Sequence, residues 1–405
     1  MRTSLLALTL IVTLAQISVA ETLEILPVKV DLSSREARQS LVVPGYDLTT
    51  AGITFESSDP KVVAIENNIA RPIGNGSAKI TARSKTGVGQ VPVIVRNFDQ
   101  PFSWSFRNHV EAVMAKTGCT SGPCHGAQSG KGGFKLSLFG YDPEGDFFTI
   151  SRQARGRRVV PSDPGRSLLL TKPTGAVPHK GGIRFDTRSL EYRVLAEWIA
   201  AGMTAPQASD PRIERIEVLP KHVTLEPGKK QQLVLMAHFS DGHTEDVTRW
   251  GRYTSTNATM ASVNDTGLVT ITGHGEGAIT AWYLSKLDTA TITVPYLDRM
   301  PSQELAAVQP RNFIDEHVLA KLASLHVPPS PVADDSEFLC RAFLDTIGVL
   351  PTKAEAQAFL ADKSPSKRDT LIEQLLDRPE FVDYWAYKWS DLLLVNSDKL
   401  KPATG

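Results

Sequence analysis

Alternating apolar and polar positions fill two separate stretches of the chain. The first stretch ends in Val91-Pro92-Val93-Ile94-Val95 and the second in Thr289-Ala290-Thr291-Ile292-Thr293-Val294. Short β-rich runs of this kind, separated by Gly, Asn, Asp and Ser turns, are typical of antiparallel sandwiches. The pattern therefore predicts one β-sandwich at residues 21–97 and a second at residues 212–296.

Helical spacing of apolar residues marks two other regions. Between the sandwiches, residues 100–207 carry one helical pattern from Phe106 to Lys116 and another from Ser189 to Ala201. After residue 308 the chain is helical again, with predicted helices at 312–325, 335–347, 353–360, 366–376 and 379–394. The predicted fold class is multidomain and mixed all-β and all-α: two sandwiches alternate with a small helical domain (100–207) and a C-terminal helical domain (308–405).

The two sandwiches also share a sequence repeat. Each begins near a Leu-Pro pair, Leu26-Pro27 or Leu219-Pro220, and each contains S-x-D/N-x-x-x-V/A-x-I/V followed by G-x-G-x-A/G-x-I-T-A. This repeat resembles the group-2 bacterial immunoglobulin-like (Ig-like) domain. The resemblance implies spacer or adhesion modules. The glycines fit turns better than a phosphate-binding loop, since they lie between strands.

The N-terminus has the pattern of a secretory signal peptide at residues 1–20. Arg2 provides a basic start, Leu5 to Leu14 an apolar run, and Ser18-Val19-Ala20 a small-residue cleavage site. No later segment approaches eighteen apolar residues, so we expect no transmembrane segment after signal cleavage. An uncleaved signal that acts as an anchor is the alternative. The predicted location is secreted, periplasmic or cell-surface.

The overall charge is balanced, with 44 Lys and Arg against 44 Asp and Glu. A balanced chain gives no global argument for nucleic acid or an anionic membrane as a partner. We therefore expect no nucleic-acid partner. Three cysteines are too few for a disulfide-stapled scaffold.

The densest chemical signal is Cys119, Cys124 and the adjoining His125. Two cysteines followed at once by a histidine is the pattern of c-type haem attachment, in which the thiols form thioethers and the imidazole binds the iron. Four residues separate the cysteines here, where two is usual. The pattern predicts one covalent haem c, with Cys119 and Cys124 as anchors and His125 as the proximal iron ligand.

A second iron ligand is expected in the loop before the second helix of this region. His179 lies in that loop and is the predicted distal ligand; Met203, after the helix, and an open or water-bound site are the alternatives. Lys180 and Arg184 stand nearby and either neutralise the haem propionates or are solvated surface charges.

Other interpretations of the same residues stay open. In an oxidising compartment Cys119 and Cys124 could form a disulfide, which would make His125 incidental. The two thiolates with His125 and His179 are also suitable zinc ligands. Trp198 packs either on the haem edge or in an ordinary core. Two further expectations concern single residues: Cys340 is a buried small residue, and His109 is a helix surface residue.

The longer motifs point to one kind of protein. They run through Pro123-Cys124-His125-Gly126, Phe343-Leu344-Asp345-Thr346-Ile347-Gly348 and Trp385-Ala386-Tyr387-Lys388-Trp389-Ser390-Asp391. Together they resemble the large secreted proteins of planctomycetes that combine a cytochrome-c-like domain, group-2 Ig-like domains and the domain of unknown function 1549, often followed by 1553. The resemblance implies more chain beyond Gly405.

The function expected from the sequence is one-electron transfer by a secreted haem protein whose Ig-like modules act as spacers. Its redox partner is unknown, and an extracellular polymer or a cell-surface component is a possible partner. The alternative is an extracellular adhesion, structural or carbohydrate-binding protein in which Cys119–Cys124 is a disulfide. An enzyme that needs further C-terminal chain is a third class, although the sequence contains no nucleophile elbow, His-Glu-x-x-His or phosphate-loop signature.

Overall fold

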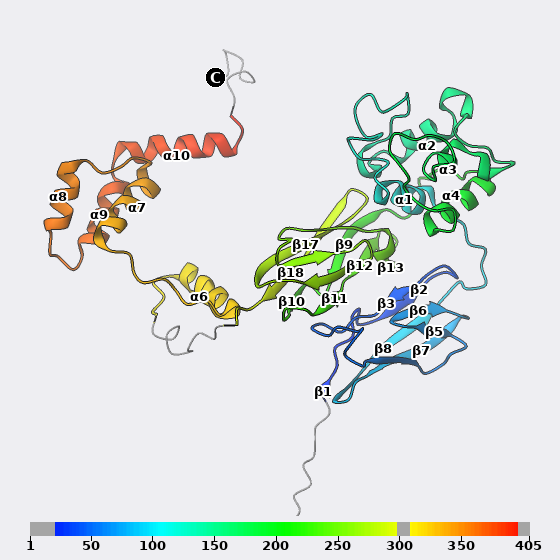
Figure 1. Cartoon of the computed structure of the whole chain (residues 1–405), viewed down its shortest axis with the longest axis horizontal. Coiled ribbons are helices and arrows are strands. Elements are labelled where there is room, and N and C mark those ends of the chain that lie inside the picture. Colours follow the sequence, from blue (N-terminus) through cyan, green and yellow to red (C-terminus); the bar gives the residue numbers. More distant parts are fainter. Residues whose placement is uncertain (1–20, 298–307, 396–405) are drawn as a thin grey trace, which may run out of the picture. The chain divides into compact units, whose positions relative to one another are not determined.

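The computed structural model describes residues 21–297 and 308–395, which form a mixed β-sheet and helical multidomain chain (Figure 1). The chain divides into two compact units, one up to Val327 and one from Pro328 onward. The predicted signal peptide at residues 1–20 lies outside the described residues. No helix in the described parts of the chain is long and apolar enough to cross a membrane.

The first sandwich is built on residues 21–97 and has its own core. One sheet has the order β1-β8-β7-β4, with β2 also paired to β8, and the other has the order β3-β6-β5. The strands are β1 (Glu21–Thr22), β2 (Val30–Leu32), β3 (Gln39–Ser40), β4 (Thr54–Ser57), β5 (Val63–Glu66), β6 (Ile69–Pro72), β7 (Gly76–Arg83) and β8 (Gly87–Val95). Every second residue of β8 is buried, as the alternating sequence predicts.

The second sandwich follows a closely similar plan. Its sheets have the orders β10-β18-β17-β14, β11-β16-β15 and β13-β12-β9. The strands are β9 (Ile213–Leu219), β10 (His222–Thr224), β11 (Lys230–Gln232), β12 (Val234–Phe239), β13 (Thr244–Asp246), β14 (Arg252–Ser255), β15 (Ala261–Val263), β16 (Leu268–Ile271), β17 (Gly275–Tyr283) and β18 (Lys286–Val294).

The sequence repeat is therefore also a repeat of strand pairing. In each sandwich the last strand pairs antiparallel with the strand before it and parallel with an early strand, β2 on β8 and β10 on β18. The equivalent registers place Val30 opposite Val93 and Val223 opposite Ile292. The repeated G-x-G segment leads into β7 in the first sandwich and into β17 in the second. The repeated sequence motif therefore lies at the same place in both folds.

Between the sandwiches, residues 100–207 form short helices joined by long loops. A π-helical turn (Phe106–Val110) continues into α1 (Glu111–Lys116), and α2 (Pro143–Ser151), α3 (Leu168–Thr171) and α4 (Leu190–Ala200) follow. Helix α4 begins where its N-cap Ser189 accepts a hydrogen bond from the Tyr192 amide. Both helices predicted for this region are confirmed, at 106–116 and within one residue at 189–201.

The helices of this region share one hydrophobic core with the second sandwich. The Tyr283 hydroxyl donates to the Asn108 carbonyl over 2.6 Å, and the Lys116 ammonium donates to the Arg249 carbonyl over 2.6 Å. Trp104 lies edge-on to Trp250, with 6.2 Å between ring centroids. The sandwich therefore supports α1, the helix that leads into the cysteine motif.

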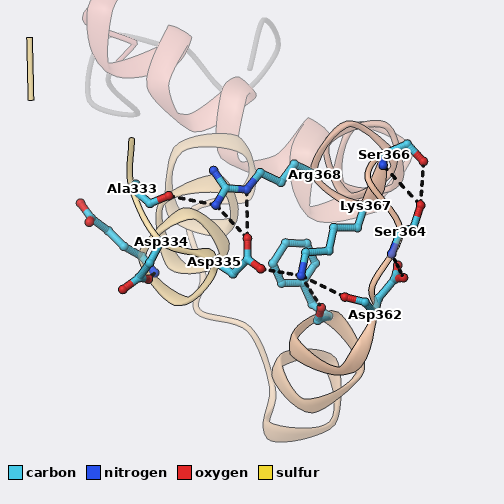
Figure 2. A network of polar contacts seen from close by, with 10 residues as sticks. Ala333, Asp334, Asp335, Asp362, Ser364, Ser366, Lys367 and Arg368 are labelled. Carbon is cyan, nitrogen blue, oxygen red and sulfur yellow. Dashed lines mark hydrogen bonds and ion pairs between the residues drawn. The ribbon is translucent and has the colours of Figure 1, made fainter. Parts of the chain in front are cut away.

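The remaining helices match their predicted positions. Helix α6 (Phe313–Leu325) belongs to the first unit, and its N-cap is Asn312, the first residue of the predicted helix. The second unit contains α7 (Asp335–Ile347), α8 (Lys353–Ala361), α9 (Lys367–Leu376) and α10 (Pro379–Leu392). Figure 2 shows how Asp335 at the start of α7 binds both Lys367 and Arg368 at the start of α9. These ion pairs fix the two helix N-termini next to each other around a small apolar core.

Candidate functional site

The loop after α1 winds tightly around His125. The His125 amide donates to the Cys119 carbonyl over 3.0 Å, and the His125 carbonyl accepts from the Leu136 amide over 2.8 Å. The imidazole Nδ1 lies 2.9 Å from the Phe134 carbonyl oxygen. Gly126 permits this winding, since a Cβ there would lie 2.2 Å from the Thr120 carbonyl oxygen. Three hydrogen bonds to backbone groups therefore hold His125 in place.

His179 is held in a similar way by its own turn. Its Nδ1 lies 2.9 Å from the Gly182 carbonyl oxygen, and the Gly182 amide donates back to the His179 carbonyl over 2.9 Å. A Cβ on Gly181 would lie 2.7 Å from His179 Cε1. Glycine at 181 thus leaves the space that the imidazole ring uses.

The structure brings the two predicted histidines together. Their ring planes are inclined by only 9°, and the ring centroids are 6.4 Å apart. In both rings a backbone carbonyl engages Nδ1, which favours the tautomer with the proton on Nδ1. Nε2 is then the nitrogen with a free lone pair for a ligand.

His125 is also in the correct protonation state for a ligand. Burial lowers the pKa of its imidazole, and the neighbouring His179 lowers it further, against the opposing effect of the Phe134 carbonyl. A lowered pKa means that the ring is neutral at neutral pH, and only a neutral imidazole nitrogen can bind a metal.

Cys119 and Cys124 lie beside the same site, and both are free thiols. The Cys119 sulfur is 3.3 Å from the Thr117 hydroxyl, and burial raises the pKa of its thiol. The Arg184 guanidinium donates to the Cys124 sulfur over 3.4 Å. The disulfide of the alternative interpretation is not present between them.

A cavity of about 620 Å³ opens between the cysteine loop, α3, α4 and the His179 turn. Its lining is mainly apolar and also includes several cationic side chains. The apolar residues include Val113, Met114, Phe134, Leu136, Leu169, Phe185 and Leu195, and the cationic residues are Lys131, Arg157, Arg158, Lys172 and Lys180. Cavities of about 300–1,000 Å³ are typical of small-molecule and cofactor sites. All four predicted site residues, Cys119, Cys124, His125 and His179, line this one cavity.

Other candidates lie elsewhere. Neither Met203 nor Trp198 lines the cavity. The Met203 amide bonds to the Trp198 carbonyl, and the Trp198 indole is buried and donates to the Thr204 carbonyl. Trp198 is therefore a core residue. Arg184 was expected either at the propionates or in solvent, and instead it contacts Cys124.

Two expectations about single residues are wrong. His109 was predicted on a helix surface, yet its ring lies against Phe102, Trp104 and Trp250. Trp250 comes from the second sandwich, which the helical pattern of His109 does not reveal. Cys340 was predicted to be buried and is exposed, because the buried stripe of α7 is formed by residues 339, 343 and 347.

The zinc alternative finds no support in the geometry. Within the described ranges, no group of three or more His, Cys, Asp and Glu side chains is placed to hold a metal ion. The site is instead two imidazoles across an apolar cavity with two thiols at its edge.

Sequence reasoning missed two buried charged residues near this site. Arg158 is 5% exposed and contacts the loop that holds His125. Glu111, on α1, is fully buried, and neither of its carboxyl oxygens has a hydrogen-bond donor. Neither residue belongs to a motif. Only the position of Glu111 in an apolar helical stripe could have drawn attention to it.

Solved structures with a similar arrangement are only distant. The structure of domains 4–9 of the surface layer protein SbsC is 13% identical. The match covers 63% of this chain and 25% of the SbsC chain, with a TM-score of 0.19. SbsC domains 5–6 are 11% identical over 69% of this chain and 99% of that chain, with a TM-score of 0.28. Invasin, a bacterial integrin-binding protein, is 13% identical over 68% of this chain and 59% of that chain, with a TM-score of 0.15. The chain thus spans a quarter of the length of the first of these structures.

Family models match two parts of the chain. Residues 212–294 match the bacterial Ig-like domain (group 2), and residues 313–403 match a family described as a protein of unknown function (DUF1549). No curated protein matches. Neither model covers residues 100–207, so the cytochrome-c-like assignment stays a prediction, as does the planctomycete resemblance. The chain therefore contains a group-2 bacterial Ig-like domain followed by a DUF1549 region.

Proposed function

We propose that residues 100–207 bind one c-type haem and that the Ig-like sandwiches hold this domain as spacers in an extracellular or surface protein. The observation that carries the proposal is the pair of near-parallel imidazoles of His125 and His179 in a cavity that Cys119 and Cys124 also line. The cysteine–histidine motif alone would leave the second ligand open.

The distance between the imidazoles fits one shared iron. Metal–nitrogen bonds to imidazole are about 2 Å long and the ring centre lies roughly 1 Å behind the nitrogen, so two rings on one metal have centroids roughly 6 Å apart. The observed separation is 6.4 Å. The apolar lining suits the macrocycle, and the lysines and arginines of the lining suit its carboxylates.

The roles of the chain's own residues follow from these contacts. Cys119 and Cys124 would hold the haem covalently, and His125 and His179 would hold its iron from two sides. When bound, the haem would supply one-electron transfer. The backbone carbonyls of Phe134 and Gly182 orient the two rings, and apolar side chains line the space between them.

The second candidate is an extracellular structural or adhesion protein without haem. The match of residues 212–294 to the group-2 Ig-like domain favours it, and the comparisons support this candidate better than the haem. The alternative expected from the sequence included a Cys119–Cys124 disulfide. Both cysteines are free in the structure, so this candidate is stated without that disulfide. The Ig-like fold is shared by many functions, however, and the fold alone does not select one of them.

A pyridine haemochrome spectrum distinguishes the two candidates. The protein is exported in a host that carries the c-type haem maturation machinery, alongside a Cys119→Ser/Cys124→Ser variant. A c-type α band that stays with the denatured wild-type protein and is absent from the double variant supports the haem. Colourless wild-type protein from a host that matures a control cytochrome would leave the structural candidate as the function.

A further inference from the structure

Arg158 is a buried cation that lines the cavity of the proposed haem site, and its hydrogen bonds go to backbone carbonyls. Its Nη1 donates to the Thr149 carbonyl over 2.8 Å and to the Gln153 carbonyl over 3.2 Å, and its Nη2 donates to the Gly133 carbonyl over 3.0 Å. Thr149 lies near the C-terminal end of α2, where carbonyls lack helical partners, and Gln153 follows that helix. One guanidinium therefore joins the end of α2 to the loop that carries Gly133.

The same guanidinium also covers the residue that orients His125. Its Cζ lies 4.7 Å from the centroid of the Phe134 ring. The Phe134 ring also lies 4.5 Å from the His125 ring, centroid to centroid, and the Phe134 carbonyl engages His125 Nδ1. Arg158 thus reaches the imidazole through a single residue, by both a ring contact and a hydrogen bond.

This arrangement is costly for a purely structural contact. A buried charge is normally paired with an opposite charge, yet no carboxylate among the described residues forms an ion pair with Arg158. A planar guanidinium can donate to several carbonyls in fixed directions and stack on a ring at once, which a lysine ammonium cannot do. Contacts behind a metal-binding histidine are a general means of fixing its ring and tautomer.

We propose that Arg158 is a positioning residue that fixes the ring orientation and the tautomer of His125. The proposal rests on the proposed function, because it assigns His125 as an iron ligand. The haem itself is not needed for the effect, since the contacts are present in the polypeptide alone.

The test compares Arg158→Lys with Arg152→Lys, which changes an exposed arginine six residues earlier in the sequence. Long-range ¹H–¹⁵N spectra of the imidazoles are recorded on the haem-free protein, and electron paramagnetic resonance spectra on the ferric loaded protein. We expect Arg158→Lys to convert His125 from one tautomer to a mixture and to shift and broaden the low-spin signal, while haem stays attached. Arg152→Lys should match the wild type.

A second variant covers the case in which Arg158→Lys does not fold. Phe134→Leu keeps the carbonyl that binds His125 and removes the ring that contacts both that histidine and Arg158, so it should give a smaller shift of the same kind. An unchanged His125 tautomer in every folded variant, even with lowered thermal stability, would overturn the proposal. Wild-type protein without haem would defeat the proposed function, whereas the haem-free spectra would still decide the role of Arg158.

Discussion

His125 and His179 come from two loops far apart in the sequence, yet their imidazole planes are within 9° of parallel and their centroids are 6.4 Å apart. Each ring is bound at Nδ1 by a carbonyl of its own loop. The two rings are therefore oriented separately, and the fold between them sets their distance. This makes it possible to disturb one ring without the other.

Gly181→Ala should disturb His179 most strongly, and its new methyl group would also lie 3.3 Å from the Arg184 guanidinium. The new methyl group would lie 2.7 Å from His179 Cε1, and the ring would have to move. We expect the visible and electron paramagnetic resonance spectra of the loaded protein to change from two-histidine coordination, while the covalent haem stays attached. Gly122→Ala is the matched control, because a Cβ there has no atom within 4 Å. Identical spectra for both variants would argue against His179 as a ligand.

The three thiols should react at different rates in haem-free protein. Cys340 is exposed and should be alkylated first, whereas Cys119 should be the slowest, because burial raises the pKa of its thiol and so lowers the thiolate fraction. Mass spectrometry of peptides after timed alkylation measures this order. After denaturation all three thiols should react. If only Cys340 reacted in denatured, unreduced protein, the two other cysteines would form a disulfide after all.

Glu111 should make stability depend on pH. Burial raises the pKa of its carboxyl well above the usual value of 4.5, and nearby Asp146 raises it further. The folded protein therefore keeps a proton that the unfolded chain releases, and the free energy of unfolding falls as the pH rises above 4.5 toward the raised pKa. A protonated Glu111 can also donate to Asp146, which would satisfy an oxygen that otherwise has no donor.

Glu111→Gln removes this linkage, since the amide does not titrate. The difference in free energy of unfolding between the variant and the wild type should shift in favour of the variant as the pH rises from about 5 to about 8. Urea denaturation at several pH values measures it. The exposed Glu226→Gln serves as the control. A constant difference across this range would show that Glu111 is ionised in the folded protein.

Tyr283→Phe should weaken the connection between the second sandwich and the helix that leads into the cysteine motif. The hydroxyl of this buried tyrosine donates to the Asn108 carbonyl over 2.6 Å. Loss of a buried hydrogen bond that leaves its acceptor unsatisfied costs about 1–3 kcal/mol. We expect a lower midpoint in urea denaturation for this variant. Tyr141→Phe, at a side chain that is 81% exposed, should leave the midpoint unchanged.

Local signals in the sequence were sufficient for most of the secondary structure. Apolar alternation located β8 and β18, and the helical spacing of apolar residues located α4 and α6. Such signals work because backbone hydrogen bonding and side-chain periodicity act over a few residues. The motif of Cys119, Cys124 and His125 was visible for the same reason, since its members are neighbours in the chain.

Contacts between distant segments could not be predicted in this way. His109 is half-buried because Trp250 of the second sandwich packs on it, and Arg158 and His125 both contact the Phe134 ring although they are distant in the sequence. The sequence by itself determined the sandwiches and the helices, and it predicted the four candidate site residues. Only the tertiary structure decided that His125 and His179 face one cavity, because loop closure and packing of the shared core set the distance between them.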